Sequence, residues 1–190
     1  MGSQAANRET VIMDWNVVAT TQSNSFLRAQ QLLARFGAVA TTDLYNVIVM
    51  RVNDVGEFLR AFSDRTAADP RLLKSIARIV PLQHTFDFSE REEFERRATE
   101  AILRFASELE GRSFHVRVKR RGHKGEISSR SEETLLQSAL IDELARRGRS
   151  GRISYDDPDA IIDVETVGDR AGLSLWTRED INRFSFLKVD

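Results

Sequence analysis

The chain has 190 residues, of which 41% are apolar and 30% are charged, and it contains no cysteine. This composition is typical of a globular protein with a sizeable core, and no apolar run approaches the roughly 20 residues that a membrane-spanning helix needs. The lack of cysteine excludes disulfides, thiolate metal sites and a cysteine nucleophile. We therefore expect a cytoplasmic protein that makes no membrane contact.

The net charge of -1 hides a strong asymmetry along the chain. Residues 112–152 carry eleven Lys and Arg against five Asp and Glu, a local charge of +6, whereas residues 153–190 carry four against nine. A basic cluster of this size is typical of a surface that binds a polyanion, because neutralised phosphates release their counterions. The alternative is that arginine is simply abundant throughout this chain.

The first part of the chain alternates short apolar runs with helical periodicity. Residues 1–12 are predicted to be a disordered lead, and residues 13–80 are predicted to form one lobe. Asp54 is a predicted helix cap. The order strand, helix, strand, strand, helix, strand is that of a ferredoxin-like βαββαβ lobe, with strands expected at 15–21, 38–41, 45–52 and 76–80.

The second part, residues 81–190, is predicted to be an αβαββ lobe, which makes the whole chain an α+β protein. Two Ser-x-x-Glu capping boxes, Ser89–Glu92 and Ser129–Glu132, mark the expected helix starts. A strand with alternating apolar residues is expected at 114–119 between the two helices. A β-hairpin is expected over residues 161–177.

Motifs for catalysis or for cofactor binding are missing. The sequence has no Walker-type loop and no Gly-x-Gly-x-x-Gly after a strand, and its three histidines, His84, His115 and His123, lack metal-ligand spacing. The paired carboxylates lie where helix starts or turns are expected, where negative charge meets the positive end of a helix dipole. We therefore predict no catalytic residue, no metal site and no cofactor.

The most informative segment is the turn at residues 119–125, Lys-Arg-Arg-Gly-His-Lys-Gly. Five ionisable donors on one turn repel one another unless they are solvated or neutralised by an anion. The two glycines allow the backbone to approach a ligand closely, and the helix start that follows offers free amides to a phosphate. A second basic run at residues 146–149 is either a solvated helix end or the far rim of the same surface.

The second lobe resembles a THUMP domain, the RNA-binding module attached to several tRNA-modifying enzymes. The residues that carry this resemblance are the strand and turn at 114–122, the helix start at 128–131, Leu135–Leu136, and the Pro-Asp-Ala-Ile-Ile-Asp-Val-Glu run at 158–165. A ferredoxin-like lobe commonly precedes THUMP in tRNA thiolation enzymes. The segment 15–21 is most similar to the stand-alone THUMP proteins of the tRNA acetylation adaptor family.

That resemblance implies a non-catalytic accessory protein. Its expected partners are tRNA, bound at the acceptor region, and a separate tRNA-modifying enzyme such as a cytidine N4-acetyltransferase. Taken with the second basic run, it predicts RNA-binding residues at Lys119, Arg120, Arg121, His123, Lys124, Ser128, Arg130, Arg146, Arg147 and Arg149.

Two alternatives from other functional classes stay open. One is a small RNA-acting enzyme with an unrecognised site, for instance one that uses His123 with a nearby carboxylate. The other is a protein-interaction subunit in which the acidic segment docks a basic partner and the arginine excess is incidental.

Overall fold

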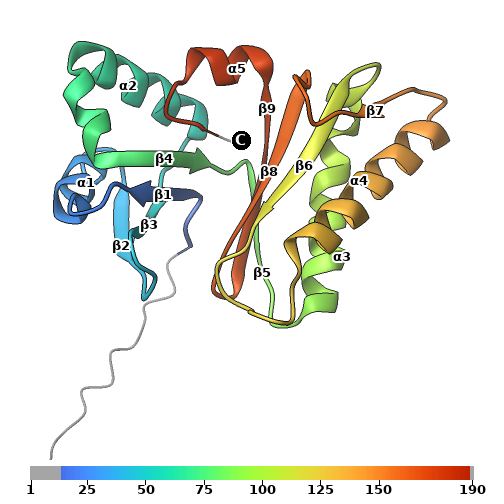
Figure 1. Ribbon diagram of the computed structural model, residues 1–190, viewed down its shortest axis with the longest axis horizontal. Coiled ribbons are helices and arrows are strands. Elements are labelled where there is room, and N and C mark those ends of the chain that lie inside the picture. The colour runs from blue at the N-terminus through green and yellow to red at the C-terminus, as the bar shows by residue number, and fades with distance from the viewer. Residues whose placement is uncertain (1–13, 189–190) are drawn as a thin grey trace, which may run out of the picture.

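The computed structural model describes residues 14–188, and the lead predicted at residues 1–12 lies outside them. The described chain forms a four-stranded and a five-stranded sheet, which stand side by side in Figure 1. No helix in the described range is both long and apolar enough to cross a membrane. The mixed α+β fold class predicted from the sequence is confirmed.

The first sheet has the strand order β2-β3-β1-β4, and each neighbouring pair is antiparallel. This is the ferredoxin-like arrangement predicted from the order of elements. Buried side chains of α1 and α2, among them Leu33 and Phe62, cover one of its faces. Its elements are β1 (Val17–Thr21), α1 (Phe26–Leu33), β2 (Ala38–Thr41), β3 (Val47–Arg51), α2 (Val55–Ala68), the 3-10 helix η1 (Pro70–Ser75) and β4 (Ile76–Pro81).

Two local features explain why these elements begin where they do. Asp54 caps α2, because its Oδ1 accepts the backbone amide of Glu57 at 2.6 Å and so satisfies one of the free amides at the helix start. Gly37 precedes β2, and a Cβ atom there would lie 2.2 Å from the carbonyl oxygen of Arg51. Only glycine therefore lets β2 begin this close to β3.

The second sheet has the order β5-β9-β8-β6-β7, in which β6 runs parallel to both β7 and β8. The β8–β9 hairpin and the β5–β9 pair are antiparallel. Helices α3 and α4 cover one face of this sheet, as Figure 1 shows. Its elements are β5 (His84–Asp87), α3 (Arg91–Ile102), the 3-10 helix η2 (Leu103–Leu109), β6 (Ser113–Lys119), α4 (Ser129–Arg146), β7 (Arg152–Ile153), β8 (Ala160–Val167), β9 (Arg170–Thr177) and the short helix α5 (Arg178–Arg183).

The predicted αβαββ order of this lobe omitted the two edge strands β5 and β7, which have four and two residues. Neither predicted capping box forms: α3 is preceded by Glu90, which makes no side-chain cap, and the amide of Ser89 donates to Glu93 instead of Glu92. Ser128, not Ser129, caps α4, with the amide of Ser131 3.5 Å from its hydroxyl, and Glu132 is fully buried instead of capping.

The C-terminal segment returns to the first sheet. Phe184, Phe186 and Leu187 are buried in the same core as α1 and α2, and the amide of Ile79 donates to the carbonyl of Phe186 at 3.0 Å. The Phe186 ring meets the Phe62 ring edge-on, with 4.9 Å between the centroids. A division of the chain into residues 13–80 and 81–190 stays a prediction, since residues 184–187 pack against the first of these parts.

The opposite face of the first sheet packs against the second lobe. Trp15, Val18 and Val49 form a small apolar cluster with Leu82, and Val167 at the end of β8 packs against it. The tip of the β8–β9 hairpin therefore lies against the ferredoxin-like lobe.

This packing predicts that Phe186 stabilises the first lobe. Replacing Phe186 by alanine should lower the free energy of unfolding by about 3–5 kcal/mol, because a buried ring with aromatic neighbours is lost from a filled core. Urea unfolding measures this change. Leu27→Ala, at a side chain that is 72% exposed, is the control and should change stability by no more than about 0.5 kcal/mol. Equal effects of the two substitutions would contradict the packing.

Candidate nucleic-acid interface

The basic turn, residues 119–128, joins β6 to α4 and is held against the β8–β9 hairpin. The amide of Arg121 donates to the carbonyl and to the hydroxyl of Thr166, at 3.2 and 3.0 Å, and the amide of Gly168 donates to the carbonyl of Arg121 at 3.0 Å. Gly122 has φ 107°, and a Cβ there would lie 3.3 Å from the Cα of Gly168. The turn is therefore a fixed structure, and glycine permits its close approach to the hairpin.

His123 braces the same turn. Its Nδ1 lies 2.9 Å from a carboxylate oxygen of Glu126, its Nε2 lies 2.9 Å from one of Asp169, and its ring packs 5.0 Å from the ring of Phe88. The hydrogen bond to Glu126, and then the one to Asp169, raise the pKa of His123 above its usual value against the opposing effect of burial. The histidine links the turn to the hairpin and to β5's end.

The predicted RNA-binding residues Lys119 and Arg121 point inward. Arg121 forms an ion pair with the buried Glu165, and its other guanidinium nitrogen lies 3.3 Å from the hydroxyl of Thr20 on β1. Burial, and then the charge of Arg78, lower the pKa of Lys119 below its usual value. These two side chains therefore lie between the lobes and contribute less charge to the outer surface than the sequence indicated.

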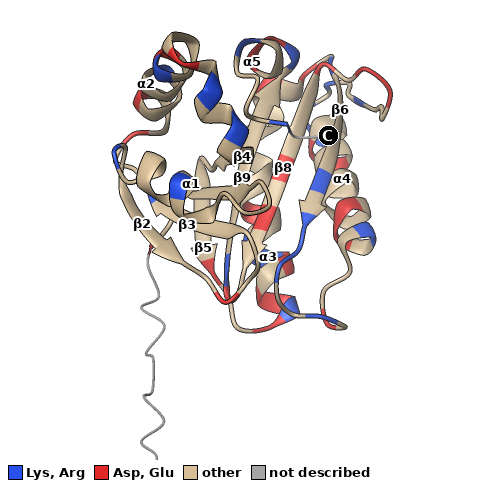
Figure 2. Ribbon diagram, turned by 60° about the vertical axis from the view of Figure 1, so that its left-hand side comes forward, with Lys and Arg blue, Asp and Glu red and all other residues tan. Residues whose placement is uncertain are grey.

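The other predicted cations of the turn face outward. Arg120 is partly exposed and donates to the carbonyl of Gly122, while Lys124 and Arg130 are exposed. Within residues 14–188, none of these three forms an ion pair with a carboxylate. Ser128 caps α4, and Arg130 lies in its first turn, close to the positive end of an 18-residue helix. Figure 2 shows this basic segment below β6.

The second basic run lies at the other end of α4 and does not join this surface. A helix of 18 residues is about 27 Å long, which separates Arg146, Arg147 and Arg149 from the turn. Arg146 and Arg147 both pair with Glu143 at 2.6 Å, and Arg149 pairs with Glu110 at 3.3 Å. The structure thus does not bring the ten predicted residues together.

A buried ion cluster between the lobes was not predicted. Arg78 of β4 binds both Asp163 and Glu165 of β8, with 2.5 Å between its Nη1 and Glu165, and Arg121 binds Glu165 from the turn. Both carboxylates are completely buried, and Arg78 is 7% exposed. In Figure 2 two acidic bands on β8 lie beside basic bands on β6. The cluster joins the first sheet, the second sheet and the turn.

Asp163 has the most perturbed environment in the cluster. Burial, and then repulsion by Glu165, raise the pKa of Asp163 to about 7, against the attraction of Arg78 and Lys119. The signal that could have revealed this cluster is the placement of two acids at positions 163 and 165 of an otherwise apolar strand, on one face by strand periodicity. Such acids are buried only when they are paired.

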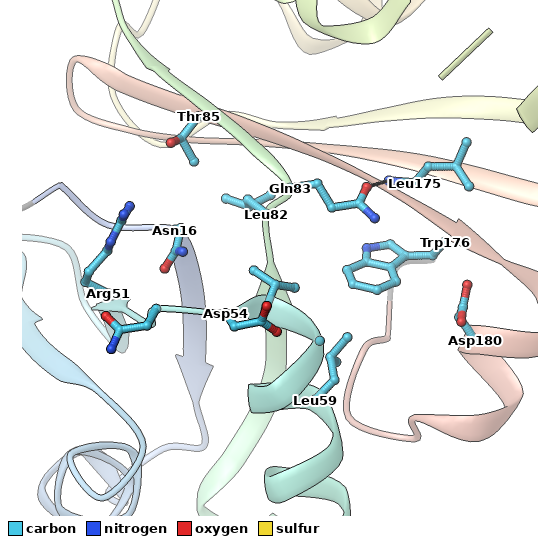
Figure 3. A pocket seen from close by; sticks show the side chains of 13 residues that line it. Asn16, Arg51, Asp54, Leu59, Leu82, Gln83, Thr85, Leu175, Trp176 and Asp180 are labelled. Atoms are coloured by element: carbon cyan, nitrogen blue, oxygen red, sulfur yellow. Dashed lines mark hydrogen bonds between the residues drawn. The ribbon is translucent and has the colours of Figure 1, made fainter. Parts of the chain in front are cut away.

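A cleft of about 550 Å³ also lies between the lobes, and Figure 3 shows its lining. Three of its polar side chains hold backbone groups: Asn16 bonds both backbone polar atoms of Val52, Asp54 caps α2, and Gln83 accepts the amide of Leu175. No group of three or more metal-ligating side chains is found among the described residues. The cleft is thus built largely from contacts that stabilise the fold.

Comparison with known sequences places this chain near tRNA-modifying proteins. It is 24% identical over 174 residues to the tRNA sulfurtransferases of Vibrio campbellii and Yersinia pestis, a match over 82% of this chain. The chain spans only 35% of the length of those relatives. No family model matches the sequence.

Solved structures share the fold. PH1313 from Pyrococcus horikoshii has a TM-score of 0.58 at 15% identity, covering 85% of this chain and 54% of that one. TrmN from Thermus thermophilus has a TM-score of 0.53 at 21% identity, covering 84% and 44%. A 4-thiouridine synthetase in complex with RNA has a TM-score of 0.51 at 12% identity, covering 85% and 41%.

These relatives overturn one prediction. We expected a non-catalytic accessory protein because the sequence resembles the tRNA acetylation adaptors and lacks catalytic motifs, but the similar sequences are named tRNA sulfurtransferases. The expectation of a non-catalytic protein is therefore wrong.

The buried cluster predicts a pH-dependent stability. Because the pKa of Asp163 is raised from 3.8 to about 7, the folded protein binds this proton more tightly than the unfolded chain does. The stabilisation from that proton is fully present below about pH 4 and is lost as the pH rises through about 7. Asp163→Asn, which resembles the neutral acid, should therefore gain stability relative to the wild type as the pH rises over this range.

Urea unfolding of both proteins at several pH values measures this difference. A stability difference that stays constant with pH would contradict the raised pKa. Asp156→Asn, at an exposed side chain, is the control and should show no such trend.

Proposed function

We propose that this chain binds tRNA within a cytoplasmic tRNA-modifying enzyme, with sulfur transfer as the reaction class. The observation that carries the proposal is its similarity to tRNA sulfurtransferases over 82% of its length. The shared fold of a 4-thiouridine synthetase that was solved with RNA adds support. An acetyltransferase as the partner has no such support, and sulfur transfer replaces it in the proposal.

The RNA-contacting surface in this proposal is the outer side of the basic turn. Arg120 and Lys124 lie in the turn and Arg130 in the first turn of α4, and none of the three forms an ion pair with a carboxylate of residues 14–188. Unpaired cations, together with free helix amides, bind phosphate oxygens. Ser128 belongs to this surface because its hydroxyl is exposed at the helix start.

The remaining predicted residues have other roles in the proposal. Arg121 and His123 hold the turn in place through their carboxylate partners, and Lys119 lies at the edge of the inter-lobe cluster. Arg146, Arg147 and Arg149 lie outside the contact surface.

Recognition through this surface depends on RNA shape and backbone. The bases of an A-form helix are hidden in a deep, narrow major groove that side chains cannot enter. A rigid turn that presents cations at fixed positions suits the regular phosphate spacing of such a helix. We therefore expect limited dependence on base sequence in the double-stranded part of the RNA.

The relatives have polypeptide that this chain does not match, so we propose that residues of the enzyme outside the matched region complete the reaction. The division into a ferredoxin-like lobe, residues 13–80, and a THUMP-type lobe, residues 81–190, is part of this proposal. The rival interpretation of a protein-interaction subunit predicts that the chain does not retain tRNA at low salt.

Charge reversal tests the surface. The triple variant Arg120→Glu, Lys124→Glu, Arg130→Glu should weaken tRNA binding. The negative slope of the logarithm of the association constant against the logarithm of the salt concentration should become less steep by about 2–3 units, because about three phosphate contacts are lost. Titration of labelled tRNA at several salt concentrations measures both quantities.

The matched control reverses three exposed cations on the first lobe, Arg60, Arg65 and Lys74. It has the same change in net charge, so a loss that depends only on net charge appears in both variants. If the turn variant and the control have the same affinity and the same salt slope, the turn is not part of the RNA-contacting surface.

A further inference from the structure

Tyr155, in the loop between β7 and β8, is an exposed aromatic residue that the basic turn does not include. Its side chain is 66% exposed, which makes it one of three large hydrophobic residues at the described surface, with Leu27 and Tyr45.

The ring of Tyr155 is held in one orientation. It stacks on His115 with 5.4 Å between centroids and 30° between planes, and its hydroxyl accepts a hydrogen bond from Gln137 Nε2 at 3.1 Å. Both supports are themselves fixed: His115 Nδ1 donates to the carbonyl of Ser154 at 3.0 Å, and Gln137 Oε1 accepts the amide of Val116 at 3.1 Å. The ring is therefore ordered in advance although most of it faces water.

The imidazole of His115, on which the Tyr155 ring stacks, is uncharged at neutral pH. Burial lowers the pKa of His115 below its usual 6.5, with a weaker effect of Arg117 in the same direction, against the raising effects of the Ser154 carbonyl and Glu133. The stack thus offers a flat, uncharged aromatic plane at neutral pH.

The aromatic plane lies on the same face of β6 as a partly exposed arginine, Arg117. His115, Arg117 and Lys119 lie at alternate positions of the strand and so on one face, and residues 115 and 119 are about 13 Å apart. Arg117 is partly exposed, although its Nε is buried and has no hydrogen-bond partner among residues 14–188. Figure 2 shows the basic bands of β6 continuing into the turn.

We propose that the Tyr155 ring is a stacking platform for an unpaired RNA base, with the partly exposed Arg117, two residues from His115 on the same face of β6, as the neighbouring cation. This inference rests on the proposed function and adds a site for single-stranded nucleotides to it. Unpaired bases stack on exposed aromatic rings, and the flanking cation binds their phosphates.

The surroundings of Tyr155 favour a base over a protein partner. Arg152, Asp156 and Asp157 around it are exposed and charged. A ring that anchors a protein partner lies in an apolar, desolvated centre, whereas a base needs only one flat face. The exposed, isolated ring fits the second case.

The test uses two RNA hairpins with the same stem, one with a single-stranded extension and one with a blunt end. The wild type should bind the extended hairpin more tightly. Tyr155→Ala should weaken binding of the extended hairpin about tenfold and leave the blunt hairpin unchanged, since one base stack is lost. Tyr155→Phe keeps the ring and should keep the preference.

Two further variants separate stacking from structure. Tyr155→Leu still covers His115 but has no flat ring, so it should behave like Tyr155→Ala. Tyr45→Ala removes a tyrosine that is 80% exposed on the first lobe and should have no effect.

The remaining outcomes contradict either the stacking platform or the proposed function. A Tyr155→Ala protein that keeps the preference for the extended hairpin, or that loses both hairpins equally, overturns the platform and leaves the proposed function standing. A wild type that binds neither hairpin nor tRNA overturns the proposed function itself.

Discussion

The buried ion cluster around Glu165 is the interaction on which the arrangement of this molecule depends. Arg78 reaches it from the first sheet and Arg121 reaches it from the turn, so one carboxylate fixes both the lobe contact and the turn. Burying charges is unfavourable unless each one is paired, and removing a partner leaves an uncompensated charge. The cluster therefore specifies one relative position of the two sheets more than it adds stability.

That pairing changes what the local charge of +6 means. Arg121 is paired with Glu165 and Arg149 with Glu110, two carboxylates outside residues 112–152, so the local charge of +6 overstates the positive charge at the surface. Among the cations predicted to bind RNA, Arg120, Lys124 and Arg130 remain for an anion, and they lie between the end of β6 and the first turn of α4. A count of charged residues along a sequence overestimates the binding surface, because ion pairs form between residues far apart in the chain.

The sequence predicted the parts of the fold that depend on local periodicity and missed those that depend on distant partners. Alternation and helix caps gave the ferredoxin-like order, whereas β7 was missed because two residues carry no period and β5 because only one of its four residues is apolar. Arg121 was correctly placed on the turn, but its partner Glu165 lies 44 residues away, and Arg78 lies 85 residues from Asp163. No local pattern contains such pairs. Tyr155 was missed for the same reason, since its orientation depends on Gln137 and His115.

The error about catalysis has a different origin. The absence of catalytic motifs concerns only the residues of this sequence. The region that matches the relatives corresponds to 35% of their length. A binding surface and a reaction centre need different chemistry, so an enzyme can carry them on separate segments. A segment with a binding surface and without catalytic motifs fits such an enzyme. A rigid turn and a fixed aromatic plane, both supported by buried polar contacts, can hold an RNA in one position. Holding the substrate in one position is itself a catalytic contribution, because a reaction between prepositioned groups avoids much of the entropy loss of their encounter.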